Sequence, residues 1–429
     1  MLARKRSCFR YLKHLSLHSY PRLYSQPRFG DVLATLLTRA TELETLCLSS
    51  CDILKVDQRV EDAFVQMKSL RVLKICQYED DIGELLARMR TPLVCADVSV
   101  SHNLDPADPV PMLSPFKDTL RHLRVSWVDF MSAGTQFPHL TSLEAELCEA
   151  EGLAEIVQCF PALQDLYMDT PDEERWSVSE AEELRAVNSR LQAAHTWPSL
   201  NSLSGSVVTL YVLGVRCHVA HINISCDIII KPVEGERLAA VLADARPTRL
   251  SLRLRASEFD IMSLAQYLLP VKDSLAKLEL HVEFRGEQYE DPSPQIYAML
   301  DTLSFLSLRT IDIWVNWTQI FHISQLRFSP DAKGESLEVE DPGQSIAGLD
   351  LAAIGLQAAR SIPTLQLAIV DGGYPLRTKV FKISRDADDS QATPTMVELE
   401  YGNADREVLL KEKYMQRAAV CHPSCSMYP

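Results

Sequence analysis

Residues 120–168 read LRHLRVSWVDFMSAGTQFPHLTSLEAELCEAEGLAEIVQCFPALQDLYM. One pattern occurs three times in this stretch: an apolar residue, two variable residues, an apolar residue, one variable residue and an apolar residue. The copies are Leu120-Leu123-Val125, Leu140-Leu143-Ala145 and Leu163-Leu166-Met168. The last two positions of each copy are two residues apart, so their side chains point to one side of a strand. Each copy therefore predicts a short strand whose apolar face has to be buried by its neighbours.

The same pattern recurs toward both ends of the chain. Further copies are Leu12-Leu15-Leu17, Leu43-Leu46-Leu48, Leu70-Leu73-Ile75, Val219-Ile222-Ile224, Leu275-Leu278-Leu280 and Leu308-Ile311-Ile313, with weaker ones at Cys95-Val98-Val100, Pro247-Leu250-Leu252 and Ile362-Leu365-Leu367. In the N-terminal half, adjacent copies begin 31, 27, 25, 25, 20 and 23 residues apart. Most of these steps fall in the range of roughly 20–29 residues that is typical of leucine-rich repeats. The sequence predicts an α/β leucine-rich-repeat solenoid, a horseshoe with parallel strands on its concave face and helices or loops on its convex face.

Helical patterns occupy the segments between the predicted strands. Apolar residues fall on one face in 29–41, 60–67 and 82–89, which predicts three helices. Ser179 and Glu182 have the spacing of a capping box, which predicts a fourth helix that runs to about Ala194. Strand and helix therefore alternate, as parallel strands require.

The organisation predicted from these patterns is a repeat region over 1–373 and a cap with a frayed tail over 374–429. The repeat region has an insertion or enlarged unit near 169–197. It also has a long loop near 321–346, where the sequence is polar and rich in proline and glycine. The cap, with strands at 379–384 and 396–400 and a helix at 406–419, would cover the last repeat's core.

Composition limits the classes of partner. The 429 residues are 46% hydrophobic and 24% charged, as in folded proteins, and the formal net charge is −15. Such a field repels a phosphate backbone, and no apolar run approaches the roughly 18 residues that cross a bilayer. The 11 cysteines lack paired spacing, which favours reduced thiols. We therefore expect a monomeric intracellular protein, cytoplasmic or nuclear, that binds neither nucleic acid nor membrane.

A polar residue follows some of the repeats at a fixed position. Three residues after the third apolar position, leucine-rich repeats often place Asn or Cys, whose side chain bonds backbone groups as the chain leaves the strand. That position holds Cys51, Asn103, Cys148 and Asn316. We predict a structural ladder of these four residues. Coincidence is the alternative, because the other repeats hold different residues there.

No catalytic constellation is visible in the sequence. The chain has no GxxxxGK[ST], GxGxxG after a strand, HExxH or GxSxG motif. Cys421, His422 and Cys425 could supply three metal ligands, but zinc sites usually need a second paired cluster, which is lacking here. We therefore predict no enzymatic activity, no metal and no cofactor.

The concave face is the predicted functional surface. Residues between the apolar strand positions point out of the horseshoe, and stacking brings those of neighbouring repeats side by side. The predicted partner-binding residues are His122, Arg124, Glu144, Glu146, Asp165, Tyr167, Asp169, Arg249 and Arg253. A basic edge, an acidic centre and a tyrosine suit a partly basic peptide or protein surface. The alternative is that these charges only keep the repeat soluble.

Three lead-ins to the repeats have a common form: Phe137-Pro-His-Leu140, Phe160-Pro-Ala-Leu163 and Trp197-Pro-Ser-Leu200. With the stretch Leu210-Tyr-Val-Leu-Gly214, they resemble the leucine-rich region of F-box proteins from mushroom-forming fungi, over about residues 9–370.

The resemblance implies the substrate-binding part of a cullin-RING ubiquitin ligase subunit. The roughly forty-residue helical F-box of that family has no room before Leu12. The F-box adaptor and cullin are therefore expected partners only if an F-box is missing from this chain. The alternative is a repeat scaffold or regulator unrelated to ubiquitin.

Overall fold

The structure is a computed structural model that forms two compact units, residues 1–223 and 224–429. Each unit is treated by itself. The residues that the structure describes are 8–18, 28–50, 52–78, 82–100, 106–132, 134–148, 152–170, 176–193, 195–228, 232–255, 261–285, 292–318, 349–372, 378–385, 393–400 and 402–411.

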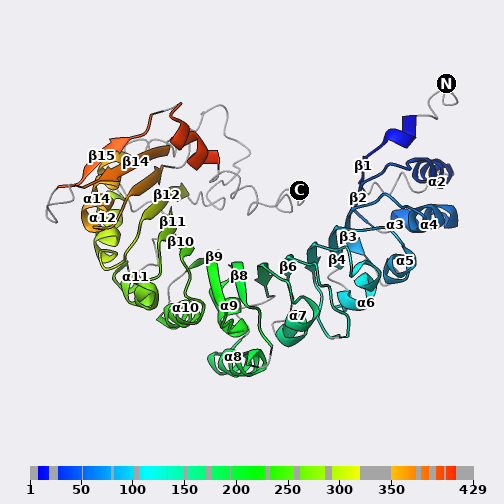
Figure 1. Ribbon diagram of the computed structural model, residues 1–429, viewed down its shortest axis with the longest axis horizontal. Helices are drawn as coiled ribbons and strands as arrows, with labels where there is room; N and C mark the ends of the chain where they lie inside the picture. The colour runs from blue at the N-terminus through cyan, green and yellow to red at the C-terminus, as the bar shows by residue number, and fades with distance from the viewer. Residues whose placement is uncertain are drawn as a thin grey trace, which may run out of the picture. The chain divides into compact units, whose positions relative to one another are not determined.

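Strands lie in the sheet of each unit in the order in which they occur along the chain (Figure 1). The first unit has β1 (His14–Leu17), β2 (Thr45–Leu48), β3 (Val72–Tyr78), β4 (Cys95–Val100), β5 (His122–Ser126), β6 (Ser142–Glu146), β7 (Asp165–Asp169) and β8 (Ser199–Gly205). β9 (His218–Ile228) crosses the boundary between the units, and the second unit continues with β10 (Arg249–Arg255), β11 (Lys277–Arg285), β12 (Thr310–Thr318), β13 (Leu367–Asp371), β14 (Thr378–Ser384) and β15 (Thr395–Glu398). Pairing is parallel from β1 to β8 and from β10 to β13, whereas β14 and β15 are antiparallel.

Helices connect most of these strands. They are α2 (Phe29–Arg39), α3 (Asp52–Lys55), α4 (Gln58–Val65), α5 (Ile82–Arg88), α6 (Pro109–Leu113), α7 (Leu153–Cys159), α8 (Val178–Gln192), α9 (Val207–Leu213), α10 (Pro232–Ala245), α11 (Ile261–Leu268), α12 (Ser293–Thr302) and α14 (Leu351–Ser361), with short 3-10 turns η2 (Cys8–Tyr11), η3 (Ser114–Phe116) and η7 (Leu269–Val271). In each unit they lie along one side of the strands (Figure 1). We call the other side the open face. The predicted α/β leucine-rich-repeat fold, with parallel strands and alternating helices, is confirmed.

The core of each unit lies between the strands and the helices. In the first unit, Leu123, Leu143, Leu166 and Leu203 stand in register on four neighbouring strands, and each is at most 2% exposed. In the second unit, Leu250, Leu278 and Ile311 form the corresponding row and are fully buried. Removal of such rows from water is the main stabilising contribution in a stacked repeat.

Two weak copies of the repeat were predicted in the wrong register. In β4 the buried triplet is Leu93-Ala96-Val98, so Cys95 lies on the open face and not in the core. In β13, Ala368 and Val370 pair with the core residues Ile311 and Ile313, which places the triplet three residues later than predicted. In both strands an alanine occupies a core position, and nearby larger apolar residues imitated the pattern in another phase.

The repeat of β8 was not predicted at all. Its triplet is Leu200-Leu203-Gly205, whose last position carries no side chain. A Cβ at Gly205 would lie 2.4 Å from the carbonyl oxygen of Met168, so only glycine fits where the two strands meet. Because this close approach requires glycine at the third position, the repeat does not match the pattern of three apolar residues.

The aromatic-Pro-x-Leu lead-ins have a structural role. Phe137, Phe160 and Trp197 are each at most 1% exposed, and the rings of Phe137 and Phe160 lie 5.5 Å apart. Trp197 Nε1 donates a hydrogen bond of 2.9 Å to the carbonyl oxygen of Phe160. Phe160 and Trp197 therefore each contact the previous lead-in, which helps to stack one repeat on the next.

The predicted helices lie within two residues of α2, α4, α5 and α8; α2 ends at Arg39 and α4 begins at Gln58, each two residues before the predicted position. The capping box was assigned to the wrong pair. The structure uses Ser177 and Glu180, whose side chain accepts a hydrogen bond of 2.8 Å from the backbone N–H of Ser177. The local sequence contains two overlapping pairs with the required spacing, and the chain uses the first.

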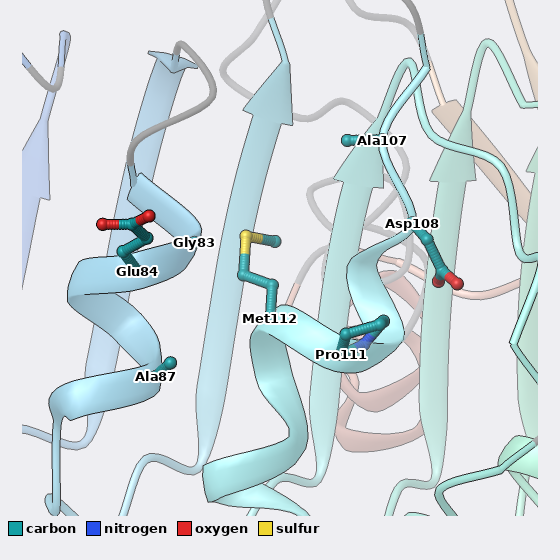
Figure 2. A pocket seen from close by; sticks show the side chains of 7 residues that line it. All are labelled: Gly83, Glu84, Ala87, Ala107, Asp108, Pro111 and Met112. Carbon is teal, nitrogen blue, oxygen red and sulfur yellow. The ribbon is translucent and has the colours of Figure 1, made fainter.

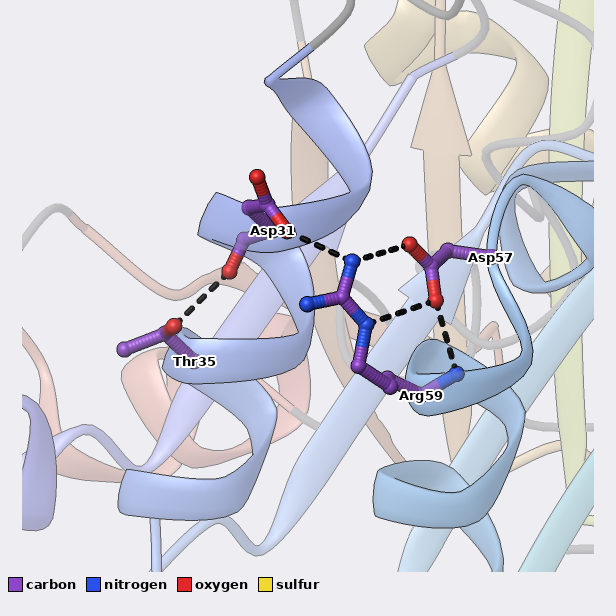
Figure 3. A network of polar contacts seen from close by, with 4 residues as sticks. All are labelled: Asp31, Thr35, Asp57 and Arg59. Carbon is purple, nitrogen blue, oxygen red and sulfur yellow. Dashed lines mark hydrogen bonds and ion pairs between the residues drawn. The ribbon is translucent and has the colours of Figure 1, made fainter.

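An ion-pair cluster joins the outer helices α2 and α4 (Figure 3). Arg59 Nη2 lies 2.6 Å from carboxylate oxygens of both Asp31 and Asp57, and Asp57 also caps α4 by accepting from the backbone N–H of Arg59. Hydrogen bonds from Arg59 lower the pKa of Asp57 to about 2. The cluster is exposed, so it orients the two helices without adding much stability.

Several expectations lie outside the described residues: the loop near 321–346, the tail beyond 411, and part of the unit near 169–197. In the region of the predicted cap, the structure has β14, β15 and a helix over 404–411. The division into a repeat region and a cap at residue 373 stays a prediction.

Candidate functional site

Strands β5, β6 and β7 bring seven of the predicted residues together on the open face of the first unit. Three rows cross these strands in register: His122–Ser142–Asp165, Arg124–Glu144–Tyr167 and Ser126–Glu146–Asp169. The β5–β7 patch consists of His122, Arg124, Glu144, Glu146, Asp165, Tyr167 and Asp169. Neighbouring parallel strands lie about 4.8 Å apart, so a single partner segment that crosses them would contact all three strands.

Arg124 is the centre of the β5–β7 patch. Its Nη2 donates to Glu146 Oε1 at 2.7 Å, and its Nε lies 3.6 Å from Glu144 Oε2. The arginine side chain is only 12% exposed. Its burial acts to lower its pKa, but the carboxylates of Glu146, Asp97 and Glu144 outweigh this and raise the pKa. Arg124 therefore holds both glutamates in fixed positions on the surface.

Asp165 is a half-buried carboxylate that has no ion pair or side-chain hydrogen bond to the described residues. Its burial raises its pKa, and the charge of His122 opposes this only in part. A desolvated carboxylate gains from a cation that a partner supplies. The β5–β7 patch carries more acidic than basic groups, so a lysine or arginine of a partner is the complementary group.

Trp127, which the sequence search passed over, lies directly after β5 at the edge of the patch. Its backbone φ is 58°, and its N–H donates to the carbonyl oxygen of Glu146 at 3.0 Å. Leu147 occupies the equivalent place after β6 with φ 53°. Large side chains seldom adopt this left-handed conformation, and such residues cluster at functional sites. A tryptophan that directly follows a repeat strand was the signal available in the sequence.

The patch continues toward β3 and β4 as a second charged pair. Lys74 Nζ lies 3.8 Å from Asp97 Oδ2, in the same row as Arg124. Three half-buried cysteines, Cys47, Cys76 and Cys95, lie around this pair. Burial raises the pKa of each thiol, so at neutral pH they are protonated and poor nucleophiles.

Arg249 and Arg253 lie on the open face of the second unit, whereas the β5–β7 patch belongs to the first unit. Arg249 Nη2 lies 2.6 Å from Glu279 Oε1, and Lys277 Nζ lies 2.8 Å from the same oxygen. Burial acts to raise the pKa of Glu279, but the two cations and a hydrogen bond from Ser251 lower it to about 2. Arg253 is exposed in a row with His281 and Trp314, whose rings meet edge to face at 4.9 Å.

The structure describes two members of the predicted ladder, and Cys51 and Asn103 lie outside the described residues. Cys148 is fully buried, and its Sγ lies 3.2 Å from the carbonyl oxygen of Glu146. Asn316 lies within β12, where the chain has not yet left the strand. The ladder stays a prediction.

The helical side carries a groove of about 400 Å³ between α5 and α6 (Figure 2). Its lining residues are Gly83, Glu84, Ala87, Ala107, Asp108, Pro111 and Met112. Glu84 and Asp108 extend to opposite sides of the groove in Figure 2 and do not converge on one point. This arrangement lacks the convergent polar groups of a small-molecule site.

Neither a metal site nor a membrane-spanning helix occurs within the described ranges. No three His, Cys, Asp or Glu side chains there are arranged to hold a metal ion. None of the described helices has the length and apolar character that crossing a bilayer requires.

Comparison with known proteins finds likenesses among solved structures. No family model matches the chain, and no curated protein matches it. Among solved structures, the chain is similar to one from the crystal structure of the Rad7 and Elc1 complex in yeast. The identity is 16% and the TM-score 0.31, over 69% of this chain and 78% of that chain.

Proposed function

We propose that this protein is a non-catalytic protein-recognition scaffold that binds a partner through the β5–β7 patch. The observation that carries the proposal is the geometry of this patch. Arg124 fixes two glutamates at 2.7 and 3.6 Å, while Asp165 lies half-buried and makes no ion pair with a described residue. A preorganised acidic surface beside an aromatic residue fits a basic segment of a partner protein.

The contribution of single residues follows from their surroundings. Tyr167 is in register with Glu144 and supplies a rigid amphipathic ring of the kind that anchors interfaces. Asp165 and Asp169 flank it two residues away on the same strand. A lysine or arginine of the partner could place its cation at Asp165 and pack its aliphatic stem against the ring of Tyr167.

Replacement of Glu144, Glu146, Asp165 and Tyr167 by alanine tests this proposal. The variant should lose its partner in a pull-down. Because the loss of Glu144 and Glu146 leaves Arg124 without its ion pairs, circular dichroism and thermal unfolding check that the fold is retained. A matched control replaces Glu182, Glu183, Glu236 and Tyr211, which lie on helices. If the variant with the four alanine replacements in the patch still binds the partner, the β5–β7 patch is not the binding surface.

We further propose that the partner is a ubiquitination target and that the chain is the substrate-binding part of an F-box-type subunit. The aromatic-Pro-x-Leu lead-ins, which resemble those of fungal F-box proteins, support this. The test is a pull-down of the F-box adaptor and cullin by this chain and by a form extended to the next upstream start codon. Capture by the extended form supports the proposal. Capture by neither form favours the alternative, a repeat scaffold unrelated to ubiquitin.

A further inference from the structure

A row of side chains precedes the strands of the first unit, one from each repeat. The backbone links its members in order: the N–H of Val94 donates to the carbonyl oxygen of Arg71 at 2.8 Å, and that of Arg121 to Val94 at 2.9 Å. We call this set the lead row. Its members are Lys13, Glu44, Arg71, Val94, Arg121, Thr141, Gln164 and Asn201.

Polar neighbours pair at both ends of the lead row. Lys13 Nζ lies 2.8 Å from Glu44 Oε1, and Asn201 Nδ2 donates to Gln164 Oε1 at 3.2 Å. The middle of the row is different. The side chains of Arg71 and Arg121 make neither an ion pair nor a hydrogen bond to any described residue, although the chain carries a net charge of −15.

These two arginines border one cavity of about 380 Å³. Its lining residues are Arg71, Pro92, Val94, Asp118, Thr119, Arg121 and His139. The arginines stand two strands apart, about 10 Å between Cα atoms at the usual spacing, with the small side chain of Val94 between them. Both guanidinium groups are exposed and long enough to reach one ligand held over Val94.

The remaining polar groups of the cavity decide the sign of the ligand's charge. His139 is exposed and has no hydrogen bond to a described side chain, so its ring can donate to a ligand. The hydroxyl of Thr119 already donates to the carbonyl oxygen of Leu93 at 2.7 Å. Asp118 is the one carboxylate among the lining residues, beside two arginines and a histidine in the same lining.

We propose that this cavity binds a phosphate group, most simply a phosphate ester on a partner's side chain. Two forked guanidinium groups suit the several oxygens of a phosphate, which accept paired charge-assisted hydrogen bonds. A phosphate ester also offers three acceptor oxygens, enough for both guanidinium groups, whereas a single carboxylate offers two. The site lies at the edge of the strands and not on the β5–β7 patch, so it does not depend on the function proposed above.

The test is calorimetric titration of the full chain with O-phosphoserine, inorganic phosphate, serine and glutamate at about 0.15 M salt. Phosphoserine and phosphate should bind, whereas serine and glutamate should not. Tighter binding of phosphoserine assigns the site to an esterified phosphate, and the reverse order assigns it to free phosphate.

Variants locate the binding. Arg71→Gln and Arg121→Gln should each weaken phosphate binding about tenfold, the effect of one charge-assisted hydrogen bond. Asp118→Asn should strengthen it, because the competing carboxylate is gone. Arg309→Gln is the matched control: Arg309 is exposed and directly precedes β12, but Ala276 and Gln366 precede the strands on either side. Equal affinity in wild type and the Arg71/Arg121 double variant, equal weakening by Arg309→Gln, or equal binding of glutamate would overturn the proposal.

Discussion

Two charged side chains on the open faces are largely buried and are held by specific partners. Arg124 is 12% exposed between two glutamates, and Glu279 is 13% exposed between Arg249 and Lys277. Burial makes each charge costly unless its partners stay in place. These buried ion pairs therefore cost some stability, but they hold the surface charges in fixed positions.

Glu279 gives a prediction about acid stability. Its pKa is about 2 in the folded chain against 4.5 ordinarily, so its contribution is complete above pH 4.5 and is lost as the pH falls toward 2. The shift corresponds to at most about 3 kcal/mol. In urea unfolding between pH 5 and 2.5, wild type should lose more stability than Glu279→Gln. Glu236→Gln, on the exposed surface of α10, should behave as wild type. Parallel pH curves for Glu279→Gln and wild type would contradict the assignment.

Much of the patch could be predicted from the sequence, because strand periodicity alone places Arg124, Glu144 and Tyr167 on one face. The ion pairs of the patch could not be predicted from the strand periodicity. Arg124 is in register with Glu144, but it donates its hydrogen bond to Glu146, one row away on the same neighbouring strand. The left-handed backbone of Trp127 depends on a bond to the next repeat, which no local pattern reports.

At the scale of elements, most helices within each unit pack against a neighbouring helix. Glycines show how close these contacts are. A Cβ at Gly235 in α10 would lie 2.1 Å from Cζ of Tyr267 in α11, whereas one at Gly83 in α5 would meet only Met112 Cγ at 3.9 Å. The first glycine is required by packing, and the second is not.

Two alanine substitutions should therefore have opposite effects. Gly235→Ala should destabilise the protein by about 1–3 kcal/mol, because the buried Tyr267 ring has to move. Gly83→Ala should stabilise it by about 0.5 kcal/mol, because alanine restricts the unfolded chain and fits the groove. Urea unfolding of both variants measures this difference. Destabilisation of similar size in both would mean that α5 packs more tightly than described.

Element boundaries show where sequence patterns fail. Triplets with a large apolar residue at the second position, such as Leu140-Leu143-Ala145, gave the correct register. That position is alanine in β4 and β13, and in β8 the third position is glycine, where the neighbouring strand approaches closely. Such positions depend on the adjacent repeat and cannot be inferred from one strand alone.

At the scale of the molecule, stability should be local, because each repeat contacts mainly its neighbours. Leu143→Ala, at a side chain that is 1% exposed in β6, should cost about 2–5 kcal/mol. Hydrogen exchange followed by mass spectrometry should show faster exchange in β5–β7 and unchanged exchange in β10–β12. Equal acceleration in both groups of strands would show that the chain opens as a single cooperative unit.

Recognition of a protein by the β5–β7 patch is the central claim, and site-specific photocrosslinking tests it most directly. A photoreactive phenylalanine analogue would replace Tyr167 on the open face or, as a control, Val187 on the exposed side of α8. The Tyr167 position should capture a specific protein through a lysine- or arginine-rich segment, Asp165→Ala should abolish the capture, and the Val187 position should capture none of that protein. Capture of the same protein from Val187 alone, or capture from Tyr167 that Asp165→Ala leaves intact, would contradict the central claim.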